Sequence, residues 1–145
     1  MAEHSFVVAS NLSVSEAFAR LVDLERVTQW DDGIISSTRT DELEEFTGRT
    51  FDVVVTGFDG RPTTMVYEIT ESDEATRFVM TGTHAMMRAV DSIELRTTDD
   101  GCELDYHGTL ELIGDERPLT DDQLDRAFPK LAAVAEHGLR RFLND

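Results

Sequence analysis

The sequence predicts an α+β fold in which a curved antiparallel sheet wraps around one long C-terminal helix. Three observations lead to this prediction. A short strand pattern is followed at once by two short helical patterns, six further strand patterns are separated by short turns, and an amphipathic helical pattern fills the end of the chain. A curved sheet closed by a helix can enclose a cavity.

Length and composition favour one cytoplasmic domain covering residues 1–145. A chain of 145 residues buries roughly 70% of its unfolded surface, so no second core is needed. Residues 1–5 lack the basic and apolar regions of a signal peptide, and no apolar run approaches the ~20 residues of a membrane span. Cys102 is the only cysteine, which excludes an internal disulfide and fits a reducing compartment.

The charge of the chain is strongly negative. The chain has 30 acidic and 13 basic residues, for a formal net charge of -17, and Lys130 is the only lysine. Such a chain is a poor partner for nucleic acid or anionic membranes, and we expect neither nucleic-acid binding nor membrane insertion. The preference for arginine fits a GC-rich coding bias or a cell interior of high salt, and the sequence does not separate the two.

The first elements are a strand and two capped helices. Residues 4–10 are β-rich, and Ser13 and Glu16 have the spacing of a capping box, with reciprocal side-chain bonds to the backbone. The following apolar residues share one helical face, and Asp23 can cap a second short helix that reaches Trp30. The sequence Asp32-Gly33 then predicts a turn.

Six strand patterns follow, rich in Val, Ile, Thr and aromatic residues. They cover residues 34–40, 50–58, 63–70, 76–83, 86–97 and 102–112. Residues 59–62, 71–74 and 99–101 separate strands with Gly, Pro, Asp and Ser, which is hairpin-turn chemistry. Connections this short require antiparallel neighbours, so the strands form a meander.

The C-terminal helix begins at a second capping box, Thr120 to Gln123, and its apolar residues recur at helical spacing up to the end of the chain. About 22 residues give roughly 33 Å, enough to cross a sheet. Pro129 lacks a backbone donor and predicts a kink one turn after the start. Alternatively, Pro129 is the first residue of the main helix, after a separate short turn.

The order of elements and four short motifs resemble the superfamily of START-like, polyketide-cyclase-like and pollen-allergen-like proteins, SRPBCC. The motifs are Asp-Leu-Glu-Arg at residues 23–26 leading to Trp30, Gly-Arg-Thr-Phe at 48–51, Tyr-Glu-Ile-Thr at 67–70, and Asp-Gly-Cys-Glu-Leu at 100–104. The resemblance covers nearly the whole chain. It departs from the common pattern at Cys102, where many members have threonine.

The resemblance implies a helix-grip fold, in which a seven-stranded antiparallel sheet holds the C-terminal helix and a hydrophobic cavity lies between them. It does not imply one activity. Members of the superfamily include lipid and hormone binders, aromatase/cyclases of polyketide chains, quinone-binding proteins and chaperone-associated modules, so the fold alone does not define the function.

Strand alternation separates residues that face the cavity from those that face solvent. Leu104, Ile93 and Ile69 set the inward parity of three strands. This parity, together with the helical pattern, predicts an apolar lining with a few polar groups, suited to a lipid, polyketide or quinone-like molecule. The expected ligand-binding residues are Met65, Tyr67, Met80, His84, Met87, Asp91, Tyr106 and Phe128.

Three of these residues are candidate catalytic groups: Asp91, His84 and Tyr106. A carboxylate in an apolar site has a raised pKa and can exchange protons near neutral pH. The structural alternatives are a salt bridge from Asp91 to Arg88, a bulge that turns Asp91 outward, a half-exposed His84 at a turn, and tyrosines that only pack. Gly82 and Gly108 mark places where the sheet bends or a ligand approaches closely.

The sequence lacks the nucleophile-elbow, phosphate-loop, dinucleotide-binding and zinc-protease motifs. Its four histidines have no ligand spacing, so no metal and no cofactor are expected. Three functions remain open: binding of a hydrophobic small molecule, a polyketide aromatase/cyclase or dehydratase, and a protein-interaction module without ligand. A filled interior, with room for no more than a water or two, would favour the last. The sequence does not distinguish a monomer from a homodimer.

Overall fold

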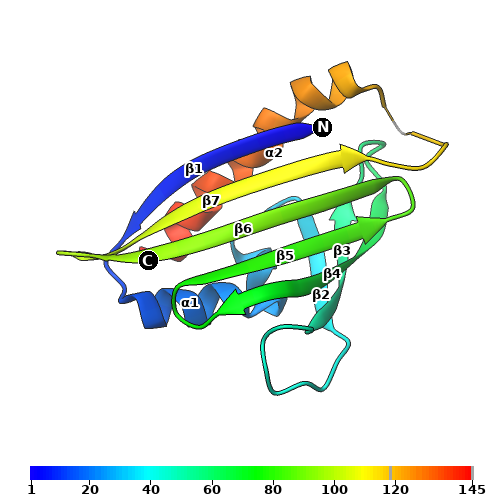
Figure 1. Cartoon of the computed structure of the whole chain (residues 1–145). Helices are drawn as coiled ribbons and strands as arrows, with labels where there is room; N and C mark the ends of the chain where they lie inside the picture. The colour runs from blue at the N-terminus through cyan, green and yellow to red at the C-terminus, as the bar shows by residue number, and fades with distance from the viewer. Residues whose placement is uncertain (118, 145) are drawn as a thin grey trace.

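The protein has the predicted helix-grip fold. The computed structural model describes residues 1–117 and 119–144. It contains a seven-stranded antiparallel sheet in the spatial order β1-β7-β6-β5-β4-β3-β2 (Figure 1). The strands are β1 (Ala2–Ser10), β2 (Ile34–Arg39), β3 (Thr50–Thr56), β4 (Pro62–Asp73), β5 (Arg77–His84), β6 (Met87–Thr98) and β7 (Gly101–Leu112). The helices are α1 (Val14–Val22), the 3-10 helix η1 (Leu24–Gln29) and α2 (Asp121–Phe142).

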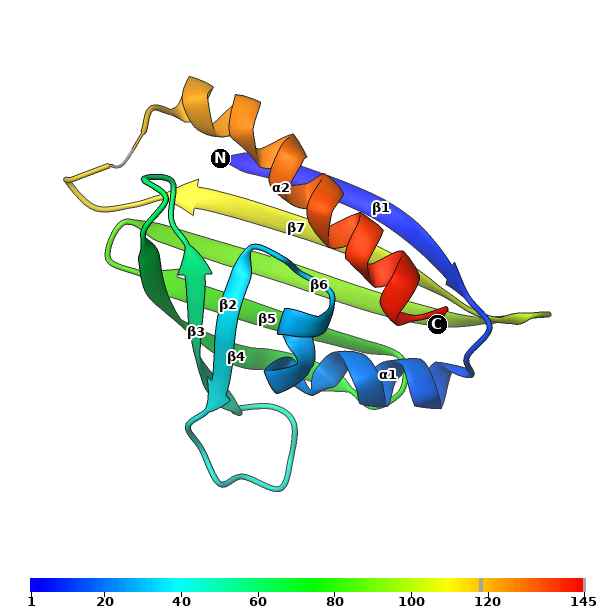
Figure 2. The same cartoon turned by 180° about the vertical axis from the view of Figure 1, so that it is seen from behind.

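All three helices cover the same face of the curved sheet. Figure 2 shows α2 crossing this face alongside β1, with α1 and η1 nearer to β2. Two clusters of buried apolar side chains fill the space between helices and sheet. The larger cluster includes Trp30 and the C-terminal half of α2, and the smaller one includes Leu124 near the start of α2.

Helix caps are formed close to the predicted positions. The Ser13 hydroxyl accepts a hydrogen bond from the Glu16 amide at 3.2 Å, and Thr120 and Gln123 form both bonds of a capping box. The return bond from the Glu16 side chain to Ser13 is not found within the described residues. Asp23 caps η1 as predicted, by accepting from the Glu25 amide at 3.3 Å.

Most strand boundaries differ from the sequence prediction by one to three residues. The β4 strand continues to Asp73, three residues beyond its expected end, because a bulge between Ile69 and Glu71 lets pairing with β5 resume past residues that read as a turn. The α2 helix runs unbroken from Asp121 through Pro129, so the alternative in which Pro129 begins the main helix is wrong. The kink at Pro129 stays a prediction.

The C-terminal end of α2 is held by side chains from β1 and α1 and by Asn144, which follows the helix. The buried Ser10 hydroxyl donates to the Leu143 carbonyl at 2.6 Å, and Arg20 donates to the Phe142 carbonyl at 3.0 Å. Asn144 donates to the Ala9 carbonyl at 2.9 Å. These bonds satisfy carbonyl groups that a helix end and a strand end leave unpaired, and they fix this half of α2 against β1 and α1.

Gly138 allows α2 to contact the end of η1. A Cβ atom at residue 138 would lie 1.7 Å from the Trp30 carbonyl oxygen, and this neighbour is backbone rather than a flexible side chain. The contact therefore requires glycine in the middle of a helix, where glycine costs about 1 kcal/mol relative to alanine.

We predict that Gly138→Ala destabilises the protein by about 1–3 kcal/mol, because α2 and η1 must move apart. Helix propensity alone predicts the opposite sign, a stabilisation of up to about 1 kcal/mol. Urea unfolding measures the difference. Val134→Ala, at a 41% exposed position of the same helix, is the control and should change stability by less than about 0.5 kcal/mol. An unchanged or higher stability of Gly138→Ala would show that the contact is not a constraint.

Candidate functional site

A cavity lies between η1, β2 and the concave face of the sheet. Its volume is about 40 Å³. A water molecule needs roughly 10–15 Å³ on this measure, so the cavity has room for roughly three waters. The lining residues are Leu24, Val27, Trp30, Asp31, Ile34, Val53, Tyr67, Met80, Asp91 and Tyr106. None of these ten belongs to α2, so this cavity is walled by η1 and β2 rather than by the C-terminal helix.

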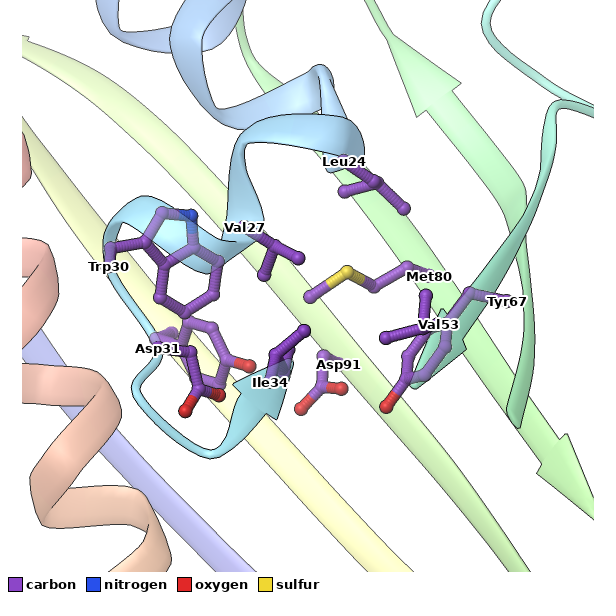
Figure 3. Close-up of a pocket in the computed structure, with 10 residues that line it drawn as sticks. Leu24, Val27, Trp30, Asp31, Ile34, Val53, Tyr67, Met80 and Asp91 are labelled. Carbon is purple, nitrogen blue, oxygen red and sulfur yellow. The ribbon is translucent and has the colours of Figure 1, made fainter. Parts of the chain in front are cut away.

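Polar and apolar groups are segregated across the cavity. Figure 3 shows the carboxylates of Asp31 and Asp91 and the Tyr67 hydroxyl gathered on one side, with Leu24 and Val27 on the other. The lining contains no Lys, Arg or His side chain. The cavity therefore has one apolar wall and one wall of oxygen atoms without a basic partner.

Two glycines create the space that the polar side chains occupy. Asp91 is paired across strands with Gly108, and a Cβ at residue 108 would lie 2.6 Å from an Asp91 carboxylate oxygen. Tyr67 is paired with Gly82, and a Cβ there would lie 2.4 Å from the Tyr67 ring. The glycines suspected from sequence thus serve close approach, and the approaching groups are these two side chains.

Asp91 is an acid in an apolar environment. Its pKa is raised to about 7, mainly because burial disfavours the charged form; the hydrogen bond with the Tyr106 hydroxyl opposes this shift, and the nearby charge of Asp31 adds to it. Strand pairing is regular through Asp91 on both sides, so no bulge turns it outward. Arg88 is exposed, and no ion pair joins it to Asp91 in the described parts of the chain. The two structural alternatives for Asp91 are therefore wrong.

Burial shifts the pKa values of the neighbouring groups in the cavity upward as well. Burial raises the pKa of the Asp31 carboxyl. The Oδ1 atom of this carboxyl accepts a 2.9 Å hydrogen bond from the Gly33 amide, which opposes the shift. Burial and the Asp91 charge raise the pKa of Tyr67 and of Tyr106. Both hydroxyls keep their protons at neutral pH and can donate hydrogen bonds.

The ring of Tyr106 is oriented by a neighbour on β1. Phe6 lies directly across from Tyr106 in the β1–β7 pairing, and the two rings stack with centroids 4.8 Å apart and planes tilted by 6°. An offset stacked pair of this kind contributes about 0.5–1.5 kcal/mol. The position of the Tyr106 hydroxyl is thus defined by packing on the strand next to it.

The eight residues expected to bind ligand lie in three places. Tyr67, Met80, Asp91 and Tyr106 line the cavity. Met65, Met87 and Phe128 belong to the smaller apolar cluster under the first half of α2, which Tyr67 also contacts. His84 lies at the β5–β6 turn, where its Nδ1 atom accepts from the Met86 amide at 3.1 Å. Of the three candidate catalytic residues, Asp91 and Tyr106 share the cavity and His84 is not among its lining residues.

Asp31 is a site residue that sequence reasoning missed. It precedes Asp32 and Gly33, and its bond to the Gly33 amide is the bond of an Asx turn. The turn signal was therefore correct, but it concealed the second role of the carboxylate as part of the cavity wall. Trp30, at the end of the predicted second short helix, is 3% exposed and also lines the cavity.

Metal ligation has no support in the part of the chain that the structure describes. No group of three or more His, Cys, Asp or Glu side chains there is arranged to hold an ion. Asp31 and Asp91 alone supply two carboxylates. Among the described residues, no helix combines the length and hydropathy that crossing a bilayer requires.

The fold and the enclosed cavity define a helix-grip domain of the START/SRPBCC superfamily. Residues 1–143 match the family described as "Polyketide cyclase / dehydrase and lipid transport", and the chain belongs to this family. A search of curated proteins finds no match.

Solved structures with low sequence identity share the fold. A START superfamily protein from Mycobacterium smegmatis has a TM-score of 0.74 at 12% identity, over 98% of this chain and 95% of that one. The protein named Ara h 8.0201 has a TM-score of 0.65 at 21% identity, over 98% of this chain and 99% of that one. The di-domain ARO/CYC StfQ of the steffimycin biosynthetic pathway gives 0.71 at 12%, over 98% of this chain but only 50% of that one. This chain thus spans half the length of StfQ.

The raised pKa of Asp91 predicts a stability that falls as pH rises. The folded protein holds a proton on Asp91 up to about pH 7, whereas the unfolded chain releases it near pH 4, so stability is lost between these values. We expect Asp91→Asn to remove about 2–4 kcal/mol of the loss between pH 5 and pH 8. Asp31 acts with the same sign, so part of the pH dependence remains.

Urea unfolding near pH 5 and near pH 8, followed by the fluorescence of Trp30, measures this effect. Asp52→Asn, at an exposed position on β3, is the matched control and should keep the pH dependence of the wild type. Equal losses in Asp91→Asn and the wild type would contradict the assignment of the buried proton to Asp91.

Proposed function

We propose that the protein binds a small hydrophobic molecule carrying a carbonyl or hydroxyl oxygen, in the cavity between η1, β2 and the sheet. The observation that carries this proposal is the segregation of the lining, with apolar side chains facing a cluster of oxygen atoms. A protonated Asp91 and the hydroxyls of Tyr67 and Tyr106 are all donors, and a carbonyl or hydroxyl oxygen of the ligand accepts from them. The family description, which includes lipid transport and polyketide chemistry, supports the same class of ligand.

The volume of the cavity sets a condition on this proposal. Ligand sites are usually about 300–1,000 Å³, so a ligand larger than a few atoms requires the wall to move. We expect the movement at η1 and β2. η1 is a six-residue 3-10 helix with weaker hydrogen-bond geometry than an α-helix, and β2 is an edge strand paired only with β3.

Native mass spectrometry of the protein purified from its own organism tests binding. We expect an additional mass under gentle conditions that disappears on denaturation. Val53→Phe fills the cavity and should abolish this mass, because Val53 is 2% exposed and lines the wall. Val54→Phe, on the opposite face of the same strand, should retain it. A bare wild-type chain, or a mass that survives in Val53→Phe, would contradict the proposal and favour a protein-interaction module.

A second candidate function is a polyketide cyclase or dehydratase reaction in the same cavity. The pKa of Asp91, about 7, favours it, because a general base works best when its pKa lies near the working pH. The Asp91 carboxylate would take a proton from carbon next to a carbonyl, while the Tyr106 hydroxyl donates to the carbonyl oxygen. The cavity would hold the chain in one folded shape.

Product analysis after incubation with a poly-β-carbonyl substrate tests this candidate. The double variant Asp91→Asn/Tyr106→Phe should lower turnover by roughly 10²-fold or more. His84→Phe should leave turnover unchanged, because His84 accepts a backbone bond at the β5–β6 turn. Adding His84→Phe to the double variant should therefore change nothing further. Turnover that persists in the triple variant would remove these residues from the reaction.

A further inference from the structure

A second hollow lies outside the cavity, where the C-terminal ends of α1, η1 and α2 meet. Its volume is about 330 Å³, and it is lined by Arg20, Arg26, Gln29, Arg141 and Phe142. We call it the arginine groove. It shares no lining residue with the cavity. Figure 2 shows how the end of α2 comes to lie beside α1 and η1.

Three guanidinium groups in one groove are unexpected in this chain. The protein has 13 basic residues against 30 acidic ones, and the groove holds three of the 13. Within residues 1–117 and 119–144, no carboxylate forms an ion pair with Arg20, Arg26 or Arg141. Five arginines outside the groove have acidic partners: Arg39, Arg77, Arg96, Arg117 and Arg140. The other four, Arg49, Arg61, Arg88 and Arg126, have none among the described residues, so the groove is distinguished by three such arginines lining one hollow.

The contacts of the groove residues fix their orientation and leave donors unused. The Arg20 Nη1 atom donates one hydrogen bond to the Phe142 carbonyl, and the Arg26 guanidinium lies 5.1 Å from the centre of the Phe142 ring. The Arg26 Nη2 atom donates to the Gln29 Oε1 atom at 3.5 Å, which leaves the Gln29 amide NH2 as a donor. Each guanidinium carries five N–H donors, so most of them have no partner among the described residues.

The side-chain groups of the groove are therefore donors and positive charges around one apolar ring. A carboxylate offers two oxygens and one charge, whereas a phosphate monoester offers three terminal oxygens and nearly two charges. Guanidinium groups bind such oxygens through paired, charge-assisted bonds. A volume of about 330 Å³ is at the lower end of the range for small-molecule sites and leaves room for an organic part beside Phe142.

We propose that the arginine groove binds the phosphate group of a small phosphate monoester. The size of the partner follows from the charge of the whole protein. A long polyanion such as nucleic acid would extend beyond the groove. It would be repelled there, because the protein has a net charge of -17. A small monoester stays within reach of the three guanidinium groups.

Titration with phenyl phosphate and with inorganic phosphate, at constant ionic strength, tests the proposal by NMR of the arginine Nε–H groups. We expect saturable shifts of the Arg20, Arg26 and Arg141 signals, with phenyl phosphate binding more tightly than inorganic phosphate. Arg26→Gln/Arg141→Gln should weaken phenyl phosphate by at least about tenfold. Arg20 is left in place because it also holds the end of α2.

Arg61→Gln/Arg88→Gln is the charge-matched control. Both arginines are exposed and lie outside the groove, so this variant lowers the positive charge equally and should keep the affinity within about twofold. Equal losses in the two double variants would overturn the site, as would shifts that do not saturate. Equal affinity for phenyl phosphate and inorganic phosphate would overturn the assignment to a monoester and indicate that the groove binds free phosphate. If the groove variant melts early, Arg141→Gln alone, at an exposed position, applies the same test.

Discussion

The close contact between Gly138 and the Trp30 carbonyl is the constraint on which the rest of the structure depends. It lets the backbone of α2 lie directly against the end of η1. Bonds from Ser10 and Arg20 to the last carbonyls of α2 hold the helix in this position. η1 is consequently kept between α2 and β2, and it forms one wall of the cavity on its inner side and part of the arginine groove on its outer side.

Much of the fold could be predicted from local patterns. Side chains alternate with a period of two along a strand, so Leu104 and Ile93 were enough to place Asp91 on the interior face. The same rule could not say how far along the strand a residue lies from the helices. Met65 and Met87 have the inward parity of the cavity residues, yet they pack under the first half of α2 in the smaller cluster.

The features that the sequence did not reveal depend on contacts between distant segments. Gly138 read as one more residue of an amphipathic helix, because the backbone it touches is about a hundred residues away. Arg20, Arg26 and Arg141 are unremarkable on their own helices and form a groove only where three helix ends meet. Local propensity carries no information about contacts between distant segments, since tertiary packing determines them.

Tyr67 is paired with Gly82, and Asp91 with Gly108. Because of these pairings, the size of the ligand that the cavity accepts does not depend on the shape of the backbone alone. The two side chains fold over their glycine partners and occupy room that the sheet itself provides. In a helix-grip protein with the same glycines and smaller residues opposite them, that room would join the cavity. Ligand size selection in such a protein can thus diverge through two side chains, with the strands and their register left intact.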